Sequence, residues 1–130
     1  MAAEVVQPSG WPRPRGYANG MIATGRLLAI GGQVGAPPGG PLPRGFVAQF
    51  AQAVDNVLAV VAAAGGAPGD VVSLTLFVLD QRPYAAATQE IGEAWRQRFG
   101  HHYPAMALVE VKGLIEPEAL VEIQGLAVIP

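Results

Sequence analysis

The 130-residue sequence contains no cysteine, one lysine and two histidines. Without cysteine the chain forms neither disulfides nor thiolate metal sites, and it has no thiol nucleophile. Its two serines, Ser9 and Ser73, lie outside any G-x-S-x-G motif, and the single Lys112 carries no signal of a Schiff-base role. His101 and His102 are adjacent in sequence, and adjacent side chains of a regular element point in different directions. We therefore expect no metal site and no serine- or cysteine-based hydrolase.

Charge is also scarce, because 8 Lys+Arg stand against 10 Asp+Glu and give a net charge of −2. This balance provides no general attraction to nucleic acid or to anionic lipid. No uninterrupted apolar run reaches the ~18 residues that cross a bilayer, and the first residues lack a basic segment followed by an apolar one. We expect a soluble, cytoplasmic protein without nucleic-acid or membrane partners.

Hydrophobic residues make up 51% of the chain, which suits a single domain over residues 1–130. Proline and glycine punctuate the segment before residue 17, so residues 1–16 are predicted to form an irregular N-terminal arm. Apolar periodicity predicts strands at 17–22, 26–34, 71–79, 105–111 and 119–129, and helices at 47–61 and 83–99. The order β-β-α-β-α-β-β predicts an α+β domain with both helices on one face of a single sheet.

The last two predicted strands are apolar on both faces. Alternation places Met106, Leu108, Leu120 and Leu126 on the face that the two helices leave uncovered. A solvated sheet face would carry polar residues, so this surface indicates self-association. The alternative is that residues 1–16 fold back over it.

Glu122 and Gln124 lie on the same predicted apolar face. A carboxylate there needs a partner, a water or a ligand, because burying it alone is costly. Such a setting can raise its pKa and make it a proton-transfer group near neutral pH. An ion pair with an arginine of a neighbouring chain is an equal alternative. Gln33 and Gly31 share one side of their strand, where the Gly31-Gly32 pair predicts a bulge that leaves room beside the amide.

A series of short motifs follows the chain in order. They are Gly16-Tyr17, Gly32-Gln33, Ala53-Val54-Asp55-Asn56-Val57, Ala63-Ala64-Gly65, Gly69-Asp70-Val71-Val72, Thr75-Leu76-Phe77-Val78-Leu79-Asp80, Tyr103-Pro104-Ala105, Val109-Glu110-Val111 and Ala119-Leu120-Val121-Glu122-Ile123. Together, at near-fixed spacing, they resemble the RidA/YjgF family from about residue 16 to residue 129.

The resemblance implies a chorismate-mutase-like α+β subunit assembled as a homotrimer, with three small-molecule pockets at the subunit interfaces. The best-known members of this family hydrolyse reactive enamine and imine intermediates to a 2-oxo acid and ammonia, and they need no cofactor. Ribonuclease or translation-inhibitor activity has been attached to some relatives, but the low basic content of this chain argues against it here.

The resemblance also assigns site residues. Tyr17 takes the position of an aromatic residue in the arm, Gln33 that of a glutamine at a strand end, and Glu122 that of the acid that helps to position the attacking water. These three residues keep the family pattern.

Four positions depart from that pattern. Met106 stands where the family has the arginine that grips the substrate carboxylate. Gly31, Thr88 and Leu108 replace a serine, an asparagine and a small polar residue, respectively. Methionine cannot supply the bidentate contact of a guanidinium, which is worth roughly 1.5 to 3 kcal/mol.

The site is therefore expected to be more apolar than the deaminase pocket. Its expected lining is the flexible Met106 beside Leu108, together with the aromatic rings of Tyr17, Trp95 or Tyr103.

Two functions remain open from the sequence. The first is an enzyme in which Glu122 orients a water against a small electrophile that Tyr17 or Gln33 holds. The second is a trimer that binds a metabolite without turning it over, which the missing family arginine favours. Arg13 or Arg15 of the arm is the candidate for a displaced cation, although solvation of both is the simpler expectation.

Overall fold

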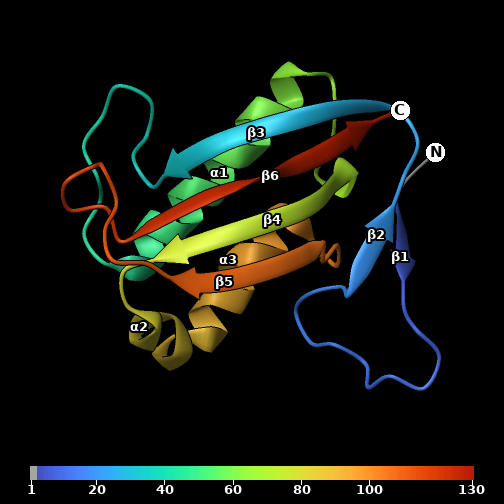
Figure 1. Cartoon of the computed structure of the whole chain (residues 1–130). Helices are drawn as coiled ribbons and strands as arrows, with labels where there is room; N and C mark the ends of the chain where they lie inside the picture. The colour runs from blue at the N-terminus through green and yellow to red at the C-terminus, as the bar shows by residue number, and fades with distance from the viewer. Residues whose placement is uncertain (1–2) are drawn as a thin grey trace.

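The computed structural model describes residues 3–130, and its main sheet has the strand order β3-β6-β4-β5 (Figure 1). The elements are β1 (Glu4–Val6), β2 (Gly20–Ile22), β3 (Arg26–Val34), α1 (Phe46–Ala63), a 3₁₀ turn (Pro68–Asp70), β4 (Val71–Val78), α2 (Gln81–Ala86), α3 (Thr88–Phe99), β5 (Ala105–Glu110) and β6 (Val121–Ile129). β6 runs antiparallel to β3 and β4, whereas β4 and β5 are parallel. The expected α+β fold, with the helices on one face of the sheet, is confirmed.

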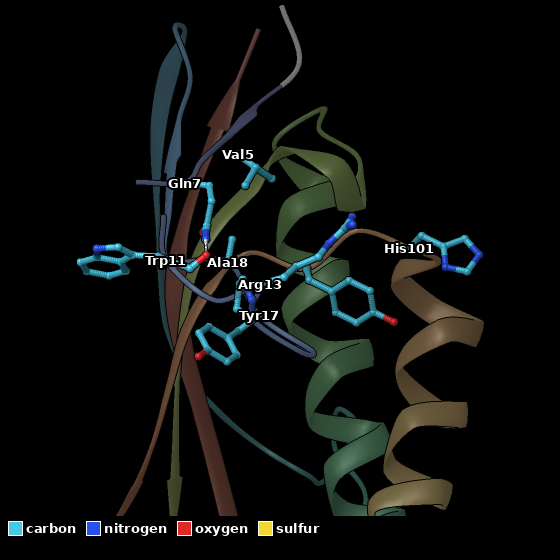
Figure 2. A pocket seen from close by; sticks show the side chains of 9 residues that line it. Val5, Gln7, Trp11, Arg13, Tyr17, Ala18 and His101 are labelled. Atoms are coloured by element: carbon cyan, nitrogen blue, oxygen red, sulfur yellow. Dashed lines mark hydrogen bonds between the residues drawn. The ribbon is translucent and has the colours of Figure 1, made fainter. Parts of the chain in front are cut away.

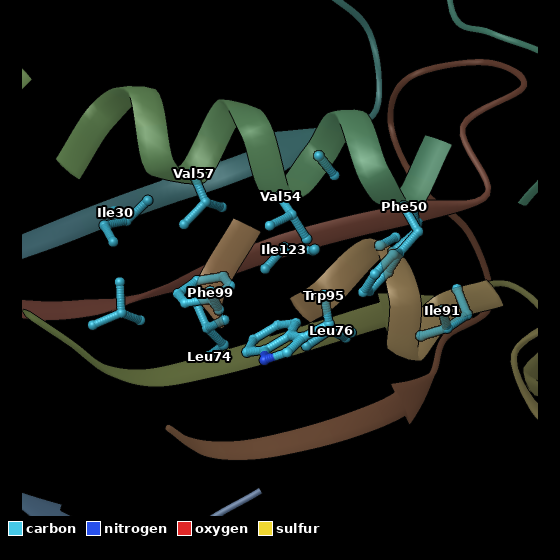
Figure 3. Packing of buried hydrophobic residues seen from close by; sticks show 14 of the residues in the cluster. Ile30, Phe50, Val54, Val57, Leu74, Leu76, Ile91, Trp95, Phe99 and Ile123 are labelled. Carbon is cyan, nitrogen blue, oxygen red and sulfur yellow. The ribbon is translucent and has the colours of Figure 1, made fainter. Parts of the chain in front are cut away.

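The core lies between the sheet and the two long helices (Figure 3). The predicted stripe of α1 is buried through Val54, Val57 and Val61, and it packs against Ile123 of β6. α1 is long and apolar enough to cross a membrane by length and composition alone. Because its apolar face packs against the sheet, we describe it as the core helix of the domain.

The end of α1 follows from two glycines. Gly65 has a φ of 83° and donates its N–H to the carbonyl of Ala62, while Gly66 donates to the carbonyl of Val61. These two bonds form a Schellman motif, which satisfies the last carbonyls of the helix. The helix end predicted at this glycine pair is confirmed.

The second predicted helix is in fact two helices, because Ala87 leaves helical geometry with φ −117° and ψ 31°. Asp80 caps α2 by accepting the N–H of Arg82, and the side-chain hydrogen bond from Arg82 holds the pKa of Asp80 at about 2. Tyr84 of α2 packs edge-on against Phe46 of α1. This contact fixes α2 separately from α3, so a continuous helix from Pro83 was the wrong prediction.

The arm is not irregular throughout. Residues 4–6 form β1, which pairs antiparallel with β2, and the strand predicted at 17–22 is confined to 20–22. The N–H of Ala18 donates to the carbonyl of Pro104 at 3.0 Å, which fixes the intervening loop at the start of β5. The β1–β2 hairpin lies at one end of the sheet and leaves the face opposite the helices open (Figure 1). Local composition missed β1 because its strand pairing depends on a segment 14 or more residues away.

β5 presents its two faces the opposite way from the prediction. Parallel pairing places Met106 beside Leu74 and Leu108 beside Leu76, and both β4 residues are buried beneath the helices. Met106 and Leu108 therefore belong to the covered face, and Leu120 also packs against the core. β5 is apolar on both sides, so alternation alone could not decide which side faces inward.

β6 follows its predicted alternation, with Val121, Ile123 and Ala127 fully buried beneath the helices. Its other side belongs to the open face of the sheet, which also carries Leu27, 68% exposed, and Val109. Among residues 3–130 no helix covers this face. Apolar side chains thus remain on a surface that is free in the single chain.

Candidate functional site

A cavity of about 570 Å³ lies between α2, α3, the sheet edge and the end of the arm. Its lining residues are Arg15, Gly16, Phe50, Leu76, Tyr84, Thr88, Ile91, Gly92, Trp95, Arg96, Tyr103 and Met106. We call this space the α3 cavity. Four of the predicted site residues meet in it, namely Thr88, Trp95, Tyr103 and Met106. Its volume falls in the range of small-molecule sites.

Trp95 forms a rigid wall of the α3 cavity. Its ring stacks on Phe99 with centroids 4.1 Å apart and on Tyr103 at 6.1 Å. Its indole Nε1 donates to the carbonyl of His102 at 3.0 Å, so the polar end of the ring is satisfied. The Trp95 ring lines the cavity and is also part of the hydrophobic core, where Leu76 and Phe99 are its neighbours (Figure 3).

The polar groups of the α3 cavity are hydroxyls and guanidiniums. Thr88 is the first residue of α3, and burial raises the pKa of the Tyr84 phenol, which stays protonated at neutral pH. Arg15 approaches from the arm and Arg96 from α3. No carboxylate lines the cavity within residues 3–130.

Gly92 lies inside α3 where no positive φ requires a glycine. A Cβ at this position would lie 3.1 Å from Nη1 of Arg96, so the guanidinium is folded back along its own helix. Glycine thus leaves space for Arg96 beside the cavity.

Gly92→Ala is expected to raise the free energy of unfolding by about 0.5–1 kcal/mol, since glycine costs that much relative to alanine inside a helix. The Arg96 side chain can shift by the few tenths of an ångström that the new Cβ requires. Urea denaturation measures the change. The control Gly65→Ala, at a φ of 83°, is expected to lower stability by about 1–2 kcal/mol. A lowered midpoint for Gly92→Ala would contradict this assignment.

Glu122 lies on the opposite, open face of the sheet. In register it stands between Val34 of β3 and Phe77 of β4. A Cβ on residue 32 would overlap the Glu122 carboxylate, so the acid packs directly against the backbone at Gly32. The side chain is half-buried, and within residues 3–130 no hydrogen bond or ion pair to its carboxylate is formed.

The bulge predicted at Gly31-Gly32 is present, because the register of β3 against β6 shifts between Ile30 and Gln33. Gln33 donates its amide to the carbonyl of Gly31 at 3.3 Å. It lines a hollow with Asn56 of α1 and therefore does not stand beside Glu122.

Tyr17 lies in a second hollow, of about 520 Å³, which the arm forms with the start of β5 (Figure 2). Trp11, Arg13 and His101 also line it. Tyr103 lines both this hollow and the α3 cavity. Tyr17 is thus close to the α3 cavity without lining it.

The structure therefore divides the predicted site. Met106 and Glu122 were expected on one face, but a single chain holds them on opposite faces of the sheet. Leu108 follows Met106 to the covered face and does not line the α3 cavity. Sequence reasoning did not single out Arg96 or Gly92, although both fall with Thr88 on one line of α3 at a spacing of four residues.

Comparisons with known proteins bear on the family and the fold of the chain. The sequence model of the family described as endoribonuclease L-PSP matches residues 12–129. The chain is 34% identical over 113 residues to a 2-iminobutanoate/2-iminopropanoate deaminase of Escherichia coli, which covers 86% of each chain. It superposes on the Rid-family protein YyfB from Yersinia pestis, a protein of unknown function, with a TM-score of 0.86 and 30% identity, covering 99% and 100% of the two chains. Against E. coli TdcF with bound serine, the TM-score is 0.71 at 29% identity, covering 98% and 99%.

Proposed function

Because the chain belongs to the RidA/YjgF family, described as endoribonuclease L-PSP, we propose that it hydrolyses a reactive enamine or imine without a cofactor. The site forms between copies of the chain in a homotrimer. One copy supplies the α3 cavity, which holds the substrate, and a neighbour supplies Glu122. The observation that carries this proposal is the separation of the two halves, since the cavity lacks a carboxylate and Glu122 lacks a partner within residues 3–130.

The chemistry needs only water and one carboxylate. Glu122 accepts a proton from water as the water oxygen forms a bond to the carbon of the protonated imine, and the C=N π electrons move onto the nitrogen, giving a tetrahedral carbinolamine. The proton then passes to the nitrogen, the C–N bond breaks, and ammonia leaves with the bonding electron pair. The hydroxyl oxygen then gives its proton to the Glu122 carboxylate and forms the C=O double bond of the 2-oxo acid. The close contact of Glu122 with Gly32 supports this role, because a packed carboxylate is held in one place.

Assembly is supported by the open sheet face. Exposed Leu27 of β3, Val109 of β5 and Leu126 of β6 lie on the same face of the sheet as Glu122. Covering such a surface removes apolar area from water, which is the main driving force of association. A neighbour seated there would also exclude water from the surroundings of Glu122.

Glu122→Gln is expected to lower kcat/KM for ammonia release from freshly generated imines by about 100-fold, the lower end of general acid–base effects. The amide keeps the shape of the side chain but cannot accept the proton. Glu116→Gln, on an exposed loop residue, is the matched control and is expected to retain wild-type activity. Wild-type protein that releases ammonia no faster than buffer, or a fully active Glu122→Gln, would contradict the proposal.

A trimer that binds a metabolite without turnover is the second candidate. It is favoured by the lining of the α3 cavity, where Met106 and aromatic rings prevail. It predicts that a compound from a metabolite library raises Tm and is recovered unchanged. A ribonuclease is a weaker candidate because the chain has a net charge of −2 and few basic residues.

A further inference from the structure

We propose that Arg15 and Arg96 together bind the carboxylate of the ligand, and that the α3 cavity selects an acid with a large apolar or aromatic body. This inference rests on the proposed function, because it concerns the substrate of the same site. It names the residues that recognise the acid group and the class of side chain that the acid carries.

The charge of the α3 cavity comes from these two arginines alone. Arg15 and Arg96 reach its lining from different elements, and no acidic side chain among residues 3–130 lines it beside them. Neither is ion-paired in the described part of the chain, where the ion-paired arginines are Arg82 and Arg98. Two unpaired guanidiniums at one cavity make a local site for an anion on a chain whose net charge is negative.

Arg96 is an exposed residue of α3 that lines the α3 cavity, and its guanidinium lies back along its own helix. Its Nη1 lies 3.1 Å from the place that a Cβ on Gly92, one turn earlier in α3, would take. Thr88 lies a further turn back on the same line of the helix and also lines the cavity. The same side of α3 thus carries the hydroxyl of Thr88, the glycine without a side chain at position 92, and the guanidinium of Arg96. A planar carboxylate matches the fork of a guanidinium and can take a further hydrogen bond from a hydroxyl.

The rest of the α3 cavity is built for an apolar group. Phe50, Leu76 and Ile91 line it from the core, and Trp95 and Tyr103 provide stacked aromatic surface. A three-carbon acid would leave most of its 570 Å³ to water. A phenyl or branched aliphatic group would displace that water and gain roughly 25 cal/mol for each Å² of apolar surface that it buries. The cavity therefore favours acids derived from large apolar amino acids.

The test is isothermal titration of the full chain with three stable probes. Phenylpyruvate has both the acid and the aromatic body, pyruvate lacks the body, and 1-phenyl-2-propanone lacks the acid. We expect phenylpyruvate to bind at least 10-fold more tightly than either of the others, since one charge-assisted contact or one buried ring is worth about that factor. Equal affinity for phenylpyruvate and pyruvate, equal affinity for phenylpyruvate and the ketone, or no binding of phenylpyruvate would overturn the inference.

Substitutions of Arg15 and Arg96 test whether these two residues bind the carboxylate of phenylpyruvate. Arg15→Gln and Arg96→Gln are each expected to raise the Kd of phenylpyruvate about 10-fold and to leave that of the ketone unchanged. Arg13→Gln, two residues away on the same arm, and Arg26→Gln, at the start of β3, are the matched controls, because neither lines the α3 cavity. Both controls are expected to keep the wild-type Kd. An unchanged Kd in Arg15→Gln and Arg96→Gln would overturn the assignment.

The two proposals fail in different ways. If phenylpyruvate binds with the expected dependence on Arg15 and Arg96 but no imine is hydrolysed, the inference stands and the hydrolase proposal fails. If imines are hydrolysed and neither arginine variant changes KM, the hydrolase proposal stands and the inference fails.

Discussion

Replacing Trp95 with alanine is expected to lower the free energy of unfolding by about 3–5 kcal/mol, the range for removing a large aromatic side chain from a core. Trp95 is 5% exposed and stacks on Phe99 at 4.1 Å. The substitution also leaves the carbonyl of His102 without its Nε1 donor. Because the ring forms a wall of the α3 cavity, the loss of core and the loss of the site go together.

Trp95→Phe distinguishes the contribution of aromatic packing from that of the indole hydrogen bond and the larger ring. Phenylalanine keeps an aromatic ring against Phe99 but cannot donate to His102. We expect a loss of about 1–3 kcal/mol, from the missing hydrogen bond and the smaller ring. Urea denaturation followed by circular dichroism gives both values. If Trp95→Ala cost less than about 1 kcal/mol, the ring would not be part of the core that we describe.

Gln49→Leu is expected to destabilise the protein by about 2–4 kcal/mol, because a buried polar hub is removed while its partners remain. Gln49, on α1, is 3% exposed. Its Nε2 donates to the carbonyls of Pro43 and Glu118, and its Oε1 accepts the N–H of Leu120 at 2.8 Å. These bonds tie the start of α1 to the segment that leads into β6.

The matched control for this prediction is Gln52→Leu on the same helix. Gln52 donates only within α1, to the side chain of Asn56, so its loss is expected to cost less than about 1 kcal/mol. Thermal and urea unfolding of the two variants measure the difference. Equal stability of Gln49→Leu and Gln52→Leu would show that the hydrogen bonds of Gln49 do not stabilise the contact between the start of α1 and the segment that leads into β6.

Strong periodicity made the elements of the core predictable. The strand at 26–34 matches β3 in both bounds, and the bulge at Gly31-Gly32 follows from glycine within a strand. The helix over 47–61 and its end at Gly65 were also predictable, because a 3.6-residue apolar repeat and a glycine pair have few other interpretations.

The arrangement of the site was less predictable. β5 is apolar on both sides, so the inward face is decided by its parallel pairing with β4, which the sequence of β5 does not contain. Placing Met106 and Glu122 together was wrong for a single chain because of this inversion. Arg96 was missed because a basic residue in the last turn of a helix is also explained by its favourable interaction with the helix dipole. The sequence does not specify that the Arg96 side chain folds back over Gly92.

The central claim is that the α3 cavity and Glu122 of different copies complete one site. Two inactive variants test it: Thr88→Trp, which fills the cavity from the first residue of α3, and Glu122→Gln. Each chain carries a different affinity tag, and assemblies that contain both are isolated after co-expression.

In a mixed trimer with cyclic symmetry, one of the three sites has an unaltered cavity from one copy and an unaltered Glu122 from its neighbour. The measurement is ammonia release from freshly generated imines by these mixed assemblies. The account predicts about one third of wild-type activity, although each variant alone is inactive. Mixed assemblies as inactive as their parents, or a chain that stays monomeric at micromolar concentration and yields no mixed assembly, would contradict it.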